Sequence, residues 1–100
     1  MYIAMNRFKI VLGREKDFEK IWQGRDFYLE KVPGFIEFHL IKGKRKETYT
    51  IYASHSTWIS EDDFSNWTKS DAFRRAHVGA AKNSEVYLER PAFEGFEVII

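Results

Sequence analysis

The sequence feature that most constrains the fold is a pair of strand-like runs in residues 35–58. Residues 35–42 and 47–58 are rich in aromatic and β-branched side chains, and a basic turn, Gly43 to Lys46, separates them. Two such runs joined by a short polar turn are typical of an antiparallel β-hairpin. We therefore expect the rest of the chain to be built around this hairpin.

The second strand of the hairpin carries bulky side chains on both faces. Tyr49 and Ile51 share one parity, and Tyr52 and Trp58 share the other. A sheet that is apolar on both faces needs cover on both. Helices can cover one face, and a second copy of the chain would cover the other, so the pattern predicts a homodimer.

A further strand is predicted over residues 2–12, because apolar side chains alternate with basic ones. Asn6 falls among the core-facing positions of this strand, which are Tyr2, Ala4, Phe8, Ile10 and Leu12. A buried amide without a partner costs about 1–3 kcal/mol. Asn6 must therefore bond either a neighbouring backbone group or a ligand in a cavity, and the pattern favours neither.

Residues 14–31 show helical periodicity, with a stripe formed by Phe18, Ile21, Trp22, Arg25 and Leu29. Arg25 lies at the edge of this apolar stripe. It can lay its stem on the core with the guanidinium in water, or it can meet a carboxylate at the mouth of a pocket. The pattern alone favours the first role.

The segment DDFSNWTKSDAFRRAH, residues 62–77, predicts two short helices. Ser60 can cap the first, and Phe64 and Trp67 share one of its faces. The Lys69–Asp71 turn can cap the second helix, Asp71 to about Ala76. Phe73 and His77 lie on the same face of this helix. A histidine at a helix end is, on that feature alone, a surface residue favoured by the helix dipole. The small residues at 79–81 nevertheless leave room for a bulky partner.

Residues 79–90 show little periodicity and are expected to form a binding loop or lid. Residues 91–100 are expected to form a last strand. The order of elements is β-α-β-β-α-β. With right-handed crossovers this order gives an α+β, ferredoxin-like fold, a four-stranded antiparallel sheet with helices on one face. We expect one domain over residues 1–100, which pairs with a second copy as a dimeric α/β barrel.

Composition excludes several classes of function. The net charge is +1 with acids and bases interspersed, which argues against nucleic-acid binding. Cysteine is absent, so thiolate chemistry is excluded, and no apolar run is long enough to span a membrane. We expect a cytoplasmic protein. His39 and His55 both fall in the hairpin, where a metal pair is conceivable but cross-strand packing is favoured.

In this fold Asn6, Trp67 and His77 are expected to surround one aromatic-lined cavity. The sequence lacks a carboxylate pair, a nucleophile triad and a glycine-rich phosphate loop. An amide, an indole and an imidazole can instead hold a flat apolar cofactor, with the imidazole on its metal. Neutral imidazole is the common axial ligand of haem.

The chain resembles the IsdG-type haem-degrading monooxygenases of the antibiotic biosynthesis monooxygenase (ABM) superfamily. The resemblance lies in Asn6 within AMNRF, in the VPGF turn, and in the run NW-x-KS-x-AF-x-x-AH, which contains Trp67 and His77. It extends from the first strand to about Ala80.

The resemblance implies a role for each site residue. His77 would be the proximal ligand of the haem iron, Asn6 would hydrogen-bond the distal oxygen species, and Trp67 would press the porphyrin out of plane. Arg25 is the implied propionate partner, and Phe64 and Phe73 are implied haem contacts; weaker propionate candidates are Arg74, Arg75 and Lys82.

Haem would then be both the oxygen-activating centre and the substrate. Its ring would open with O2 and reducing equivalents from an external electron donor, a reductase or small reductant, releasing iron and a linear tetrapyrrole. Two alternatives remain at this stage. One is a cofactor-independent ABM-type monooxygenase acting on a phenolic or quinol substrate, and the other is a non-catalytic haem-binding or haem-buffering protein.

Overall fold

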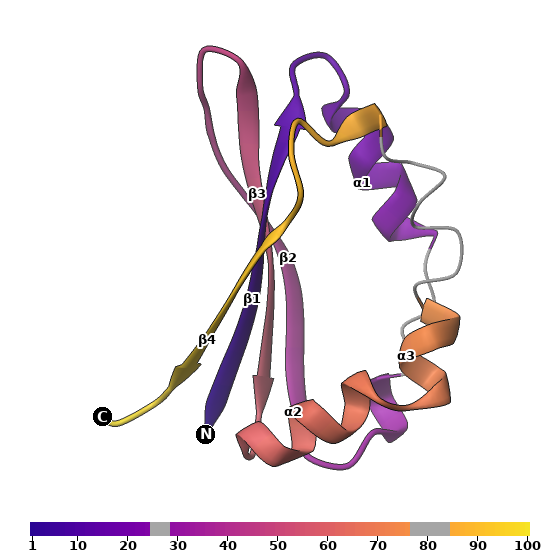
Figure 1. The fold of residues 1–100 in the computed structure, drawn as a ribbon, viewed down its shortest axis with the longest axis vertical. Helices are drawn as coiled ribbons and strands as arrows, with labels where there is room; N and C mark the ends of the chain where they lie inside the picture. Colours follow the sequence, from indigo (N-terminus) through magenta and orange to yellow (C-terminus); the bar gives the residue numbers. More distant parts are fainter. Residues whose placement is uncertain (25–28, 77–84) are drawn as a thin grey trace.

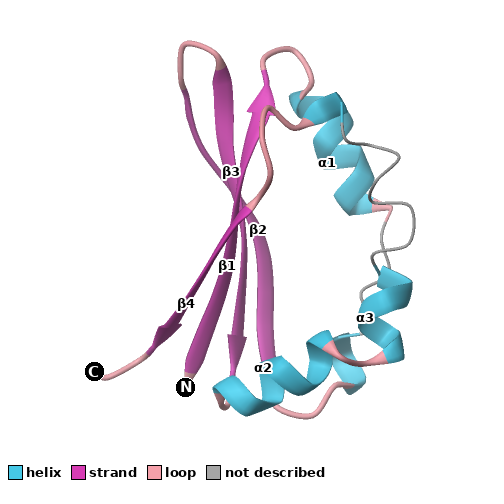
Figure 2. Cartoon of the chain, viewed as in Figure 1, coloured by secondary structure: helices cyan, strands magenta, loops and turns pink. Residues whose placement is uncertain are grey.

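The computed structural model describes residues 1–24, 29–76 and 85–100. Four strands form one antiparallel sheet in the order β2-β3-β1-β4, and the helices lie against one face of it (Figures 1 and 2). The strands are β1 Tyr2–Val11, β2 Phe35–Arg45, β3 Tyr49–Trp58 and β4 Ala92–Glu97; the helices are α1 Glu15–Gln23, the 3-10 helix η1 Leu29–Lys31, α2 Glu61–Thr68 and α3 Asp71–Ala76. This arrangement confirms the ferredoxin-like prediction.

The alternation predicted for the first strand is confirmed along β1. Tyr2, Ala4, Phe8 and Ile10 are buried beneath the helices, whereas Arg7 is exposed on the opposite face. The strand occupies the middle of the sheet and pairs with β3 on one side and with β4 on the other. Residues at its centre are therefore held by hydrogen bonds from both neighbours.

The predicted hairpin is confirmed, but its turn lies further along the chain than the sequence indicated. The basic segment placed in the turn continues β2 as far as Arg45, and β3 begins at Tyr49. The register shifts between Lys42 and Arg45, and the Lys46 amide donates to the Tyr49 carbonyl at 2.6 Å. Long basic side chains remain solvated at the open end of a hairpin, so they do not force the strand to stop.

The single helix predicted over residues 14–31 is wrong in length. The helix α1 ends at Gln23, where Gly24 caps it by donating to the Lys20 carbonyl at 3.1 Å. Glycine is costly inside a helix and favoured at its end. Leu29 is buried as predicted, but it lies in the separate element η1. Arg25 lies outside the described residues.

The two helices predicted in residues 61–76 are confirmed as α2 and α3. The Ser60 hydroxyl accepts a hydrogen bond from the Asp63 amide at 3.2 Å and so caps α2. The Ser70 hydroxyl accepts from the Phe73 amide, also at 3.2 Å. The second cap separates the helices and lets α3 leave in a new direction (Figure 1).

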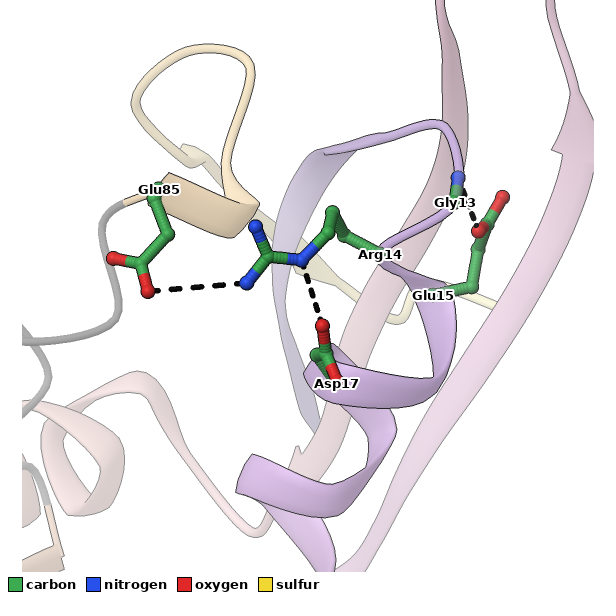
Figure 3. A network of polar contacts seen from close by, with 5 residues as sticks. All are labelled: Gly13, Arg14, Glu15, Asp17 and Glu85. Carbon is green, nitrogen blue, oxygen red and sulfur yellow. Dashed lines mark hydrogen bonds and ion pairs between the residues drawn. The ribbon is translucent and has the colours of Figure 1, made fainter.

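A polar network joins the start of α1 to the chain that leads into β4 (Figure 3). Arg14 contacts Asp17 at 2.6 Å and Glu85 at 3.8 Å. The neighbouring carboxylate of Glu15 accepts from the Thr50 hydroxyl and from the Gly13 amide, both at 2.8 Å. The Thr50 hydrogen bond is the main cause that lowers the pKa of Glu15.

Of the segment 79–90, which is predicted to form a binding loop or lid, the structure describes residues 85–90, and these pack against the core. Val86 is buried in the core beside Phe8 and Phe18, and Tyr87 forms a β-bridge with Ile10. These side chains close the α1 end of the molecule. The last strand is also shorter than predicted, because β4 ends at Glu97 and the apolar residues Val98, Ile99 and Ile100 are exposed.

The buried residues form two clusters on the helix side of the sheet. One gathers around α1 and consists of Phe8, Ile10, Phe18, Trp22, Tyr52 and Val86. The other gathers around α2 and consists of Tyr2, Ala4, Leu29, Trp58 and Trp67. The core is therefore divided into an α1 part and an α2 part. None of the described helices is long and apolar enough to cross a membrane.

The opposite face of the sheet is covered by none of the described helices (Figure 1). Alternation along the strands places Ile3, Met5 and Arg7 on this face, with His39 and His55 paired directly across β2 and β3. The two histidines are therefore the near neighbours that the sequence suggested. The face mixes apolar and charged side chains.

Candidate functional site

A cavity of about 310 Å³ lies on the helix side of the sheet, where the two core clusters meet. The four strands, α1, α2, α3 and η1 all contribute to its wall. The lining residues are Ala4, Asn6, Trp22, Leu29, Phe38, Ser54, Ser56, Trp58, Phe64, Trp67, Thr68, Phe73 and Phe93. The wall is mostly aromatic, with a few polar groups. This is the usual composition of a small-molecule site.

Asn6 supplies an amide to this cavity from the middle of β1. It pairs with Ser54 of β3 and Phe93 of β4, and all three residues line the cavity. Within the described part of the chain, no hydrogen bond is found for the Asn6 side chain. The alternative of a backbone partner, left open by the sequence, is therefore not realised in the described residues.

Trp67 forms the wall opposite the sheet and is 9% exposed. Its ring lies 5.4 Å from that of Trp58 and 4.8 Å from that of Phe73, the latter edge-on. Phe64, one helical turn earlier, stacks on Phe93 at 5.6 Å. The Phe64 ring also lies 6.1 Å from that of Trp67, so the indole is held by rings from β3, α2 and α3.

A larger, more open groove of about 940 Å³ adjoins the cavity on the side of η1. The two hollows share Leu29, Phe38 and Trp67 as lining residues. The groove does not include Asn6, and it is bordered by charged groups such as Glu30, Lys31 and Asp63. We therefore regard the smaller cavity as the candidate site and the groove as its surroundings.

Four of the six site residues inferred from sequence meet at the cavity: Asn6, Phe64, Trp67 and Phe73. The other two, His77 and Arg25, lie outside the described residues, as does Lys82. Among the weaker basic candidates, Arg74 forms an ion pair with Asp71 within α3 and Arg75 is exposed.

Sequence reasoning missed the two serines of β3. Ser54 and Ser56 are 7% and 8% exposed and both line the cavity. The Ser56 hydroxyl accepts from Trp58 Nε1 at 2.9 Å and donates to the Ala4 carbonyl at 3.4 Å. Both serines have the same parity as Tyr52 and Trp58, so polar residues at core-facing positions were a detectable signal.

The described cavity wall carries hydrogen-bonding groups but no ionisable ones. Its polar residues are one amide, two serines, a threonine and the indoles. No grouping of three metal-ligating side chains occurs in the described ranges. Hydrolytic acid–base chemistry therefore has no support from this wall, whereas binding of an apolar, planar molecule does.

Comparison with known proteins places the chain in a family. It belongs to the antibiotic biosynthesis monooxygenase family, whose profile matches residues 1–79. The resemblance stated from the sequence is thereby confirmed.

Particular relatives are similar at the level of the whole domain. The chain is 35% identical over 83 residues to the heme oxygenase (staphylobilin-producing) of Staphylococcus saprophyticus, covering 82% of this chain and 78% of that protein. It is 31% identical over 81 residues to a heme-degrading monooxygenase of Bacillus thuringiensis, covering 77% and 71%. The structure of the heme-degrader MhuD from Mycobacterium tuberculosis, with two hemes bound in its active site, matches with a TM-score of 0.78 at 26% identity, covering 100% and 97%.

The packing of Trp67 leads to a prediction about stability. We expect Trp67→Ala to lower the free energy of unfolding by about 3–5 kcal/mol, because it empties a buried site between three rings. Trp67→Phe keeps a ring there and should cost about 1–2 kcal/mol. Urea unfolding of both variants and the parent protein measures the difference. Equal losses for the two variants would contradict the packing role.

Proposed function

We propose that the protein is a haem-degrading monooxygenase, which opens the porphyrin ring with O2 and reducing equivalents and releases iron and a linear tetrapyrrole. The observation that supports this most is the meeting of Asn6 and Trp67 at one apolar cavity. The relatives named heme oxygenase and heme-degrading monooxygenase support the same activity.

Asn6 would be the group that orients oxygen. Its amide faces the cavity from a strand that is held on both sides, and the described residues leave its hydrogen-bonding capacity to a ligand. An amide N–H fixed in this way stabilises negative charge that develops on an oxygen species at the substrate. It would also direct that oxygen toward one carbon of the ring.

Trp67 and the phenylalanines would shape the substrate. A flat macrocycle in this cavity would contact the Trp67 indole on one side, with Phe64 and Phe73 along its edges. Since Trp67 is held by three rings, it can press on the substrate without moving away. Such pressure would distort the porphyrin out of its plane, which is a form of ground-state strain.

His77 would hold the haem iron, and Arg25 would pair with a propionate. His77 follows α3 directly in the sequence, and α3 contributes Phe73 to the cavity wall. Imidazole is a common axial ligand of haem, and guanidinium groups suit carboxylates through paired hydrogen bonds. The electrons would come from outside the chain, from a reductase or a small reductant.

We further propose that two copies associate through the sheet face that the described helices leave uncovered. Ile41 and Phe96 are each 43% exposed, and alternation along their strands places both on that face. Burying such side chains against a second copy stabilises both sheets. The two helix layers would then lie on the outside of the dimer.

Titration with haemin tests both the proposed function and the role of His77. We expect a saturable Soret band from the purified protein, followed under ascorbate and air by decay of the band and release of chelatable iron. Catalase is included to remove peroxide. The His77→Ala variant should bind haemin at least tenfold more weakly, because the iron loses its protein ligand.

The other outcomes of this titration are also informative. A Soret band that persists under reductant would contradict degradation and identify a haem carrier. The absence of any band would favour the cofactor-independent monooxygenase, which oxygen uptake with phenols and quinols would then test. Normal binding and turnover by His77→Ala would show that another residue is the ligand.

A second prediction concerns Asn6. We expect Asn6→Ala to bind haemin with an affinity close to that of the parent protein, but to degrade it about a hundredfold more slowly, because one preorganised donor is lost. Single-turnover decay of the Soret band measures the rate separately from binding. Unchanged decay would remove Asn6 from the mechanism.

A third prediction concerns assembly. Sedimentation of the parent protein should give the mass of a dimer, and Phe96→Glu should shift it toward the monomer by placing a charge in the buried face. Phe93→Glu is the matched control, because Phe93 lies in the same strand and is 49% exposed but faces the helix side of the sheet. Dissociation by both substitutions, or by neither, would argue against this face as the interface.

A further inference from the structure

Ser54 lines the cavity with a hydroxyl that the described part of the fold does not use. The residue is 7% exposed and belongs to β3, the strand that pairs with β1. For the part of the chain that is described, no hydrogen bond is found for its side chain. A hydroxyl that opens on a cavity without a protein partner is available to a ligand or water that occupies the cavity.

The neighbouring serine shows what a purely structural hydroxyl does in this fold. Ser56 lines the same cavity and has nearly the same exposure, but its hydroxyl is engaged with Trp58 Nε1 and with the Ala4 carbonyl. Ser54 has no such partners. Hydrogen bonds within the fold therefore account for the Ser56 hydroxyl, whereas the Ser54 hydroxyl is available to a molecule in the cavity.

Ser54 is also the direct cross-strand partner of Asn6. Side chains at paired positions of antiparallel strands start about 4.5–5.5 Å apart at Cβ and point to the same face. A hydroxyl and an amide in this relation can both reach a single small acceptor between them. The aromatic rings around them lower the local polarity, which strengthens any hydrogen bond made there.

We propose that Ser54 is a second hydrogen-bond donor, beside Asn6, to the oxygen species or small anion at the substrate. This inference rests on the proposed haem-degrading function. The hydroxyl would share the developing negative charge with the Asn6 amide and would fix the direction in which the oxygen points. Two donors define a direction more narrowly than one.

Fluoride binding to the ferric haem complex tests whether Ser54 donates a hydrogen bond to a ligand of the iron. Fluoride accepts hydrogen bonds from groups near the iron, and the measurement needs no turnover. We expect Ser54→Ala to weaken fluoride binding about tenfold, equivalent to about 1.4 kcal/mol. Ser54→Thr keeps the hydroxyl and should restore most of the affinity. The C–O stretching frequency of the ferrous carbon monoxide complex should rise in Ser54→Ala but not in Ser54→Thr.

Thr68→Val is the matched control. Thr68 also lines the cavity, but its hydroxyl already donates to the Ser65 carbonyl at 2.7 Å. Its replacement should leave the fluoride affinity and the C–O stretch unchanged. Urea unfolding adds a readout of structure, because Ser54→Ala removes an unpartnered hydroxyl and should not lower the free energy of unfolding.

The outcomes separate this inference from the proposed function. Suppose that the parent protein forms its Soret complex and that Ser54→Ala binds fluoride as tightly as the parent protein. The role of Ser54 as a donor is then overturned, whereas the proposed haem-degrading function stands. Equal weakening by Thr68→Val would overturn that role as well, because the effect would then be general to the cavity. If the parent protein forms no Soret complex, the proposed function and the role of Ser54 are both contradicted.

Discussion

The pairing of β1 with β3 is the constraint on which the rest of the structure depends. One register brings Asn6 opposite Ser54 and Ala4 opposite Ser56, and it faces all four toward the helices. A slip of one residue would turn each of these side chains to the other face of the sheet. The long ladder on both sides of β1 prevents such a slip, so the polar part of the cavity is fixed by backbone hydrogen bonds.

The cavity exists because bulky rings on the helices and strands pack into two separate clusters. Large, rigid aromatic groups such as Phe18 around α1 and Trp58 beside α2 fill their own ends of the core and leave space where they meet. The caps at Ser60 and Ser70 set the angle between α2 and α3 and thus the position of Trp67. Local capping and distant ring packing together shape one site.

Much of this was predictable from the sequence, and the failures have physical causes. Strict alternation identified the inward face of β1, and the serine caps located both α2 and α3. The ends of α1 and of the hairpin differ from the prediction, because the apolar stripe continues past Gly24, where the helix stops, and because the basic residues extend β2. Val86 was missed because one buried residue in an aperiodic segment gives no pattern. The unused hydroxyl of Ser54 could be recognised only from the structure, which shows that neighbouring Ser56 is hydrogen-bonded.

The cavity wall contains Trp22, Trp58 and Trp67, which are all of the tryptophans in the chain. Each indole therefore lies beside any molecule that occupies the site. A porphyrin absorbs at the wavelengths where tryptophan emits, so its binding would quench the intrinsic fluorescence of all three tryptophans. Tryptophan fluorescence would therefore report whether the cavity is occupied, and substrate binding and product release could be followed in real time without a label.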